Sequence, residues 1–132
     1  MLVLITGGAG VVGRSLCREY LSQGYQVKVI VLPQDPGVSL LPSEVSVFYG
    51  DVSKKESIEA AFENVDLVCH LAAVLISKNP EDYHRVNYLG TTHVMELSQK
   101  AKVKKFVLIS SISVIYPIRT PYAESKYNYS LL

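Results

Sequence analysis

The 132-residue chain has only two cysteines, almost no net charge and no apolar run long enough to cross a membrane. Cys17 and Cys69 lie far apart and match no metal-binding spacing, which indicates buried thiols in a reducing cytoplasm. The net charge of +1 gives no reason to expect nucleic acid or an anionic membrane as a partner. The first apolar segment is short and uncharged at its start, unlike a signal peptide. With 48% hydrophobic residues, the sequence predicts one cytoplasmic globular domain with a large core.

A glycine cluster directly follows the first apolar run, residues 2–5. Gly7, Gly8, Gly10 and Gly13 precede a helical pattern, so the segment predicts a strand, a tight turn and a helix. Glycines suit a place where a phosphate approaches backbone N–H groups at a helix N-terminus, because a Cβ atom would obstruct it. The expected ligand is a dinucleotide. Two spacings fit, Gly8-x-Gly10-x-x-Gly13 and Gly7-x-x-Gly10-x-x-Gly13, and both stay open.

Further apolar segments alternate with helical patterns along the rest of the chain. We expect the later strands at residues 26–31, 45–49, 66–70 and 106–110. Strands alternating with helices predict an α/β fold, a Rossmann-type doubly wound parallel sheet, and right-handed crossovers give the strand order 3-2-1-4-5. The ligand is then expected above the first strand, where the strand order reverses.

Two helices have sequence signals of their own. Ser53 and Glu56 have the spacing of a capping box ahead of a short helix. Asn79 and Pro80 are typical of an N-cap and first helical residue, and the helix that they open continues to about residue 101, a length of about 30 Å at 1.5 Å per residue. Gly90 inside this helix predicts close packing against the sheet.

Candidate chemistry follows the fifth predicted strand. Tyr122 and Lys126 are four residues apart at the start of a final helix, so they share one face. A tyrosine that transfers protons near neutral pH needs a cation beside it, and an ammonium at about 4 Å supplies about 4 kcal/mol at an effective dielectric constant of 20. Their place beyond the carboxyl end of a central strand favours an active site over a surface pair.

The chain resembles the extended short-chain dehydrogenase/reductases, also called the NAD-dependent epimerase/dehydratase family. The resemblance covers the whole chain. Its motifs are residues 6–13, Gly50-Asp51-Val52, His70-Leu71-Ala72-Ala73, Val86-Asn87, Gly90-Thr91, Ser110-Ser111 and Tyr122-x-x-x-Lys126.

This resemblance implies a nicotinamide cofactor and a set of residues around it. The implied cofactor-binding residues are Gly7, Gly10, Val11, Val12, Gly13, Asp51, Val52, Leu71, Ala72, Ala73, Asn87 and Lys126. Within this set, Asp51 and Val52 are expected at the adenine and Asn87 near the active-site helix. Lys126 is expected at the nicotinamide ribose.

The implied reaction is hydride transfer between the nicotinamide and a secondary alcohol or ketone, part of a nucleotide sugar or a steroid-like molecule. Ser111, Tyr122 and Lys126 are the implied catalytic residues, with Ser111 holding the substrate oxygen and Tyr122 transferring its proton. Ser113 competes with Ser111 for this role. The alternative function is a non-catalytic NAD(P)-binding or sensing domain.

The residues at the ends of the second and fourth predicted strands indicate the role of His70 and the choice between NAD and NADP. His70 is expected to pack at a strand end rather than to act as an acid or a metal ligand. Val31 and Leu32 occupy the end of the second strand, where an acidic residue would bind the ribose 2′-hydroxyl, and Asp35 comes a few residues late. Because no arginine stands there to bind a 2′-phosphate, we expect the cofactor to be NAD rather than NADP.

Family members continue beyond the equivalent of residue 132 into a substrate-binding region. We therefore expect this region to be absent here and the chain alone to be catalytically incompetent and to self-associate as a homo-oligomer. One face of residues 67–69 and 106–109 is expected to lack cover, and the fifth strand to be an open edge. The helix that begins at Pro121 is expected to be too short to fix Tyr122 and Lys126.

Overall fold

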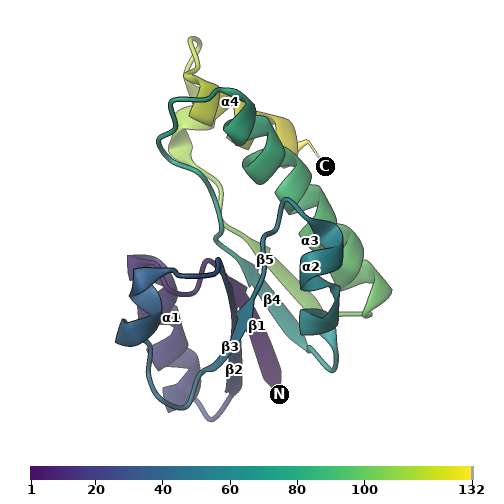
Figure 1. Cartoon of the computed structure of the whole chain (residues 1–132). Coiled ribbons are helices and arrows are strands. Elements are labelled where there is room, and N and C mark those ends of the chain that lie inside the picture. Colours follow the sequence, from purple (N-terminus) through teal and green to yellow (C-terminus); the bar gives the residue numbers. More distant parts are fainter. Residues whose placement is uncertain (132) are drawn as a thin grey trace.

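The computed structural model describes residues 1–131 and contains a five-stranded parallel sheet in the order β3-β2-β1-β4-β5 (Figure 1). Its strands are β1 (Leu2–Thr6), β2 (Gln26–Val31), β3 (Ser46–Tyr49), β4 (Leu67–His70) and β5 (Lys105–Leu108). The α/β class, the Rossmann-type sheet and the strand order are confirmed. Strand β1 is central, and its last residue, Thr6, stands opposite Ile30 of β2 and His70 of β4.

Helical segments connect the strands. They are α1 (Val11–Ser22), a 3₁₀ turn (Pro36–Leu40), α2 (Lys55–Ile58) with a 3₁₀ turn (Glu59–Phe62), a π-helical segment (Tyr83–Leu89) that continues into α3 (Gly90–Lys100), a 3₁₀ turn (Ile112–Ile115) and α4 (Pro121–Ser130). Within residues 1–131, none of these helices has the length and apolar character needed to cross a membrane.

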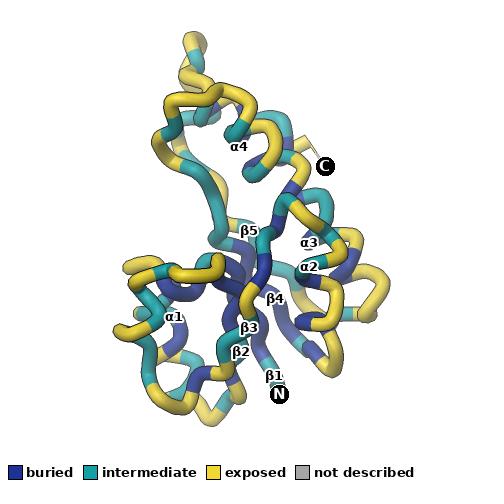
Figure 2. The backbone as a smooth tube through the Cα atoms, in the orientation of Figure 1, coloured by how far each residue is buried: buried dark blue, intermediate teal, exposed yellow. Residues whose placement is uncertain are grey.

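Two hydrophobic cores lie on opposite faces of the sheet, and Figure 2 shows the buried backbone of β1 and β4 between them. On the α1 side, Cys17 packs with side chains of β1, β2 and β4 such as Ile5 and Val29. On the other side, Ile58 and Leu97 from α2 and α3 pack against side chains such as Leu4. Alternate side chains of one strand point to opposite faces, so β1 contributes to both cores.

The expectation that one face of β4 lacks cover is wrong. Leu67 is 8% exposed and Cys69 is 2% exposed, because both belong to the core on the α1 side. The Tyr20 hydroxyl from α1 lies 3.5 Å from the Cys69 Sγ atom. Of strands β4 and β5, β5 is the one with incomplete cover, since it is an edge strand whose Val107 is only half-buried.

The long helix begins near the expected residue but is not α-helical throughout. The Asn79 side-chain oxygen accepts a hydrogen bond of 3.1 Å from the Glu81 N–H, as expected of a residue that caps a helix N-terminus. The π-helical segment then precedes α3. Gly90 permits a close approach to Val52 beyond β3, rather than to the sheet itself: an added Cβ would lie 2.8 Å from the Val52 Cγ2 atom.

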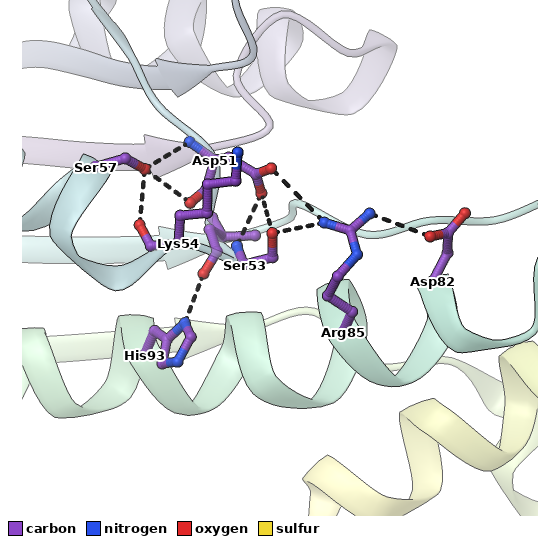
Figure 3. Close-up of polar contacts among 8 residues, drawn as sticks. Asp51, Ser53, Lys54, Ser57, Asp82, Arg85 and His93 are labelled. Atoms are coloured by element: carbon purple, nitrogen blue, oxygen red, sulfur yellow. Dashed lines mark hydrogen bonds and ion pairs between the residues drawn. The ribbon is translucent and has the colours of Figure 1, made fainter.

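The expected capping box at Ser53 and Glu56 is wrong. The Asp51 carboxylate accepts hydrogen bonds from the Ser53 N–H at 2.9 Å and from its hydroxyl at 2.7 Å, as Figure 3 shows. Lys54 therefore occupies the N-cap position, and α2 begins only at Lys55. Asp51 binds Ser53 because an aspartate side chain readily accepts a hydrogen bond from the backbone N–H two residues later.

Candidate functional site

A cleft with a volume of about 570 Å³ opens at the carboxyl ends of β1, β2 and β4. Ten of the expected cofactor-binding residues line it: Gly7, Gly10, Val11, Val12, Gly13, Asp51, Val52, Leu71, Ala72 and Ala73. Nine further lining residues are outside that expected set: Ile30, Val31, Leu32, Asp35, Gly50, Val74, Leu75, Arg85 and Val86. The cleft therefore lies where the strand order places a ligand.

The glycine turn forms one wall of the cleft, and its geometry favours one of the two open spacings. Gly7, Gly10 and Gly13 line the cleft, whereas Gly8 is buried and an added Cβ there would overlap the Val29 side chain. Gly7 has a φ of +69°, a conformation that favours glycine. Gly10 is the N-cap of α1 and has no side chain to occupy the first N–H groups of that helix. The turn can therefore present backbone N–H groups to an anion.

Asp35 lines the cleft although it comes four residues after the end of β2. Gln34 has a φ of +66°, and the Asp35 Oδ1 atom accepts a 2.8 Å hydrogen bond from the Gly37 N–H. These two features form a turn that places Asp35 among the residues lining the cleft. The Asp-Pro-Gly turn pattern was the available signal, since aspartate favours such local hydrogen bonds.

Arg85 is the cation among the lining residues. One guanidinium nitrogen donates a 2.7 Å hydrogen bond to the Ser53 hydroxyl and lies 3.8 Å from an Asp51 carboxylate oxygen. The other is 3.1 Å from Asp82, one turn earlier (Figure 3). This arrangement joins the loop after β3 to the π-helical segment. Sequence reasoning missed Arg85 because a residue's face on a π-helical segment differs from the face that α-helical spacing gives.

Asn87 is fully buried behind the cleft wall rather than on its surface. Its side-chain oxygen accepts a 2.7 Å hydrogen bond from the Val74 N–H, and its amide donates to the Val74 carbonyl at 3.0 Å. The amide also donates to the Ser125 hydroxyl of α4 at 2.9 Å. Asn87 therefore ties the lining loop after β4 to the helix that carries Tyr122 and Lys126.

Helix α4 is anchored, contrary to the expectation of a loose end. The Thr120 hydroxyl caps it by accepting a 3.2 Å hydrogen bond from the Ala123 N–H, and Pro121 is its first residue. Ser125 and Tyr129 are buried. The Tyr129 hydroxyl donates a 2.7 Å hydrogen bond to the Ile109 carbonyl just beyond β5. These contacts fix the orientation of the helix.

Lys126 is only 4% exposed, and its ammonium is held from several sides. It donates to the Ile109 carbonyl at 3.4 Å and lies 5.6 Å from the ring centre of Tyr122 and 4.8 Å from that of Tyr129. Burial lowers the pKa of Lys126 to about 8. Tyr122 is half-buried beside it, so the two residues share a face as their spacing predicts.

Both candidate serines lie in the segment after β5. The Ser111 and Ser113 hydroxyl oxygens are 2.8 Å apart, and Ser111 caps the 3₁₀ turn by accepting a hydrogen bond from the Ser113 N–H. Both side chains are half-buried. Lys126 contacts the carbonyl two residues before Ser111, so the segment and α4 converge.

The fold and the cleft together define a Rossmann-type nucleotide-binding protein. The model of the NAD dependent epimerase/dehydratase family matches residues 3–130. The chain belongs to this NAD dependent epimerase/dehydratase family, and its cofactor class is a nicotinamide dinucleotide.

Similar proteins include dehydrogenases named for sterols and steroids. The chain is 34% identical over 113 residues to the human sterol-4-alpha-carboxylate 3-dehydrogenase, covering 85% of this chain and 29% of that protein. It is 33% identical over 123 residues to a Mycobacterium tuberculosis 3 beta-hydroxysteroid dehydrogenase/Delta 5-->4-isomerase, covering 86% of this chain and 32% of that protein. The chain spans about a third of the length of these relatives.

Solved epimerase structures share the fold. The Thermus thermophilus UDP-glucose 4-epimerase, solved in complex with NAD, is 28% identical, has a TM-score of 0.86 and is matched over 99% of this chain and 49% of its own. An epimerase from Methanothermobacter thermautotrophicus is 30% identical with a TM-score of 0.88, covering 98% of this chain and 45% of that chain. The chain therefore corresponds to about half of each of these structures.

Proposed function

We propose that residues 1–132 are the NAD(P)-binding domain of an oxidoreductase or epimerase that acts on a secondary alcohol or ketone. The observation that supports this proposal is a chain of hydrogen bonds that connects the cleft to α4. Val74 lines the cleft, and the Asn87 side chain binds both Val74 and Ser125, the residue next to Lys126. A dinucleotide in the cleft would thus place one end on the glycine turn and extend toward the candidate catalytic residues.

The proposed chemistry uses three side chains of this chain. Lys126 is buried with its pKa lowered to about 8, and it places its positive charge 5.6 Å from the ring centre of Tyr122. Tyr122 transfers the proton of the substrate hydroxyl. Ser111, with Ser113 hydrogen-bonded to it, holds the substrate oxygen. The bound nicotinamide supplies or accepts the hydride.

Sterol-like molecules and nucleotide sugars are the proposed substrate classes. The similar proteins named for sterols, steroids and UDP-glucose support both. A screen of secondary alcohols and ketones from the two classes, monitored by nicotinamide absorbance, identifies which one is used.

The deciding experiment is Tyr122→Phe, made in catalytically active protein. We expect turnover to fall by a factor of about 10² or more while NAD affinity stays within about twofold, because only the proton-transferring hydroxyl is removed. Undiminished turnover would overturn the assignment. Dinucleotide binding without any hydride transfer, across the whole screen, would instead support the alternative of a sensing domain, and any hydride transfer would exclude it.

Asp35 supports a preference for NAD over NADP. Its carboxylate lies on the cleft wall near the end of β2, where it suits a ribose hydroxyl and repels a 2′-phosphate. We expect Asp35→Ala to weaken NAD binding by about tenfold and to leave NADP binding unchanged or tighter, since a charge-assisted hydrogen bond is worth about 1.5–3 kcal/mol. Calorimetric titration with both cofactors measures this, with Glu44→Ala, an exposed residue outside the cleft, as the control. Tighter binding of NADP by the unaltered chain would contradict the preference.

A further inference from the structure

His70 is a buried titratable residue at the end of β4 that the proposed chemistry does not use. Its side chain is 2% exposed and does not line the cleft. The Thr6 hydroxyl oxygen lies 2.6 Å from its Nδ1 atom, and the Thr91 hydroxyl oxygen lies 2.9 Å from its Nε2 atom. The imidazole thus bridges β1 and α3 through two threonines.

The partners of these threonines determine where the imidazole proton sits. The Thr91 hydroxyl donates its proton to the Asn87 carbonyl at 2.6 Å, so toward His70 it can only accept. His70 must therefore carry its proton on Nε2. Its Nδ1 atom is then an acceptor, and the Thr6 hydroxyl donates to it. Burial, with a smaller contribution from Lys126, lowers the pKa of His70 to about 3, which agrees with a neutral ring.

The same hydrogen bonds continue into the loop at residues 71–74. The Thr6 hydroxyl oxygen accepts the N–H groups of Leu71 at 3.2 Å and Ala72 at 3.1 Å. At the other end of the loop, the Asn87 side chain binds both the N–H and the carbonyl of Val74. Joined by the covalent structure of Asn87 and of the loop, these hydrogen bonds form a closed circuit that runs from Thr6 through His70, Thr91 and Asn87 to Val74 and back along the loop backbone.

This loop is part of the cleft wall and is packed tightly on the glycine turn. A Cβ atom added to Gly7 would lie 2.9 Å from the Ala72 nitrogen and 3.0 Å from its Cα atom. A small displacement of the loop would therefore alter the wall and the turn together, and both line the cleft.

We propose that His70, in its neutral Nε2–H form, is a positioning residue that closes this circuit and so holds the loop at residues 71–74 in the geometry that binds the dinucleotide. The inference rests on the proposed function, because it assigns His70 a role toward the same cleft. It predicts that a change at Thr91, which lies outside the cleft, reaches the cofactor through His70.

Thr91→Val tests this with a matched control on the same helix. Thr91 and Thr92 each donate a hydroxyl proton to the carbonyl four residues earlier, but only Thr91 also accepts from His70. We expect Thr91→Val to weaken NAD binding by about fivefold to tenfold, the effect of about one lost hydrogen bond, and Thr92→Val to change it by less than about twofold. Isothermal calorimetry on the 132-residue chain measures both affinities.

A spectroscopic readout separates positioning from a general loss of stability. In ¹⁵N NMR of the unaltered chain, we expect His70 to show a protonated Nε2 and an unprotonated Nδ1, without titration between pH 5 and 8. In Thr91→Val, amide hydrogen exchange should accelerate at Leu71 and Ala72 more than in the core strand β1.

Each outcome decides one of the two hypotheses. If the unaltered chain binds neither NAD nor NADP, the proposed function fails and this inference fails with it. If it binds NAD and Thr91→Val binds equally well, the inference alone fails. An Nδ1–H tautomer in the folded chain would also overturn it, because the circuit cannot then close.

Discussion

At the scale of single residues, the glycines of the turn are required for different reasons. An added Cβ at Gly13 would lie 2.6 Å from three backbone atoms of Gly7 and Gly8, so this glycine lets α1 pack against the turn. Gly7 instead needs its positive φ and leaves room for the loop after β4. The glycines are therefore needed for close packing within the turn as well as for the approach of a phosphate.

We expect Gly13→Ala to lower the free energy of unfolding by about 2–3 kcal/mol, because backbone atoms cannot move aside as a flexible side chain would. Urea denaturation measures the change. Gly24→Ala is the control, since Gly24 also has a positive φ, +80°, but an added Cβ would meet nothing within 4 Å. Backbone strain alone should make that variant less stable by about 1 kcal/mol. Equal losses in the two variants would contradict the packing argument.

Lys126 links burial to a pH dependence of stability. Its pKa is about 8 in the folded chain and about 10.5 when unfolded, so folding favours the neutral amine. Below about pH 8 the buried ammonium lowers stability, and this loss disappears as the pH rises from 8 to 10.5.

We therefore expect Lys126→Met to be more stable than the unaltered chain at pH 7, by about 2–3 kcal/mol, and to lose this advantage by pH 10.5. Chemical denaturation at several pH values measures it, with the exposed Lys105→Met as the control. The Ile109 carbonyl keeps its hydrogen bond from Tyr129 in this variant. A gain independent of pH would contradict the assigned cause.

At the scale of elements, the strands follow from the sequence and some helix details do not. Apolar segments and their alternation with helices predict all five strands to within about two residues, and short right-handed crossovers predict their order. The Ser53 capping box fails because Asp51 competes for the same serine, and the four-residue motif Ser53–Glu56 does not include Asp51, which lies two residues before it. The π-helical segment was missed because apolar residues three or four apart fit both helix types.

Helix α4 shows how tertiary contacts rescue a short helix. An isolated helix of its ten residues would be marginal in water. Here Asn87 and Ile109 bind it from two sides.

We expect Thr120→Ala to destabilise α4 by about 1 kcal/mol, since the capping hydroxyl is lost. Amide exchange of the first turn should accelerate, whereas exchange in β1 should not. Thr120→Ser, which keeps a capping oxygen, is the control. Unchanged exchange at Ala123 in Thr120→Ala would show that the cap contributes nothing.

At the scale of the molecule, the cleft was largely predictable and its connections were not. The glycine turn and the strand ends bring ten of the expected cofactor-binding residues together around the cleft, because parallel strands end at the same edge of the sheet. Asp35 reaches the cleft through a local turn, and Asn87 lies behind the wall, bound to Ser125, which is 38 residues away in sequence. Such pairings depend on how separate elements dock, which no local pattern encodes.

Self-association remains a prediction, now confined to one edge of the sheet. Strand β5 is an edge strand, and Ile109 just beyond it is 45% exposed. We expect the chain to form dimers or larger species at raised concentration, and Ile109→Lys to reduce them, because a charge at an edge opposes strand pairing. Size-exclusion chromatography with light scattering measures this. Leu40→Lys, at a residue 57% exposed on the β3 side, is the control. A monomer at all concentrations would contradict the prediction.

The π-helical segment has a consequence for how the chain tolerates changes in length. Each residue of an α-helix advances the helix by about 100° and each residue of the wider π turn by less, so removing one residue changes the angle between the side chains on either side of the deletion. Arg85 faces the cleft, Asn87 faces Ser125, and Gly90 lies against Val52. These three residues keep their contacts only while the angles between them around the helix axis stay as they are. Substitutions at the exposed Leu89 are therefore expected to be mild, whereas its deletion would put either Asn87 or Gly90 on the wrong face. At Leu89 the presence of a residue is therefore under stronger constraint than its identity.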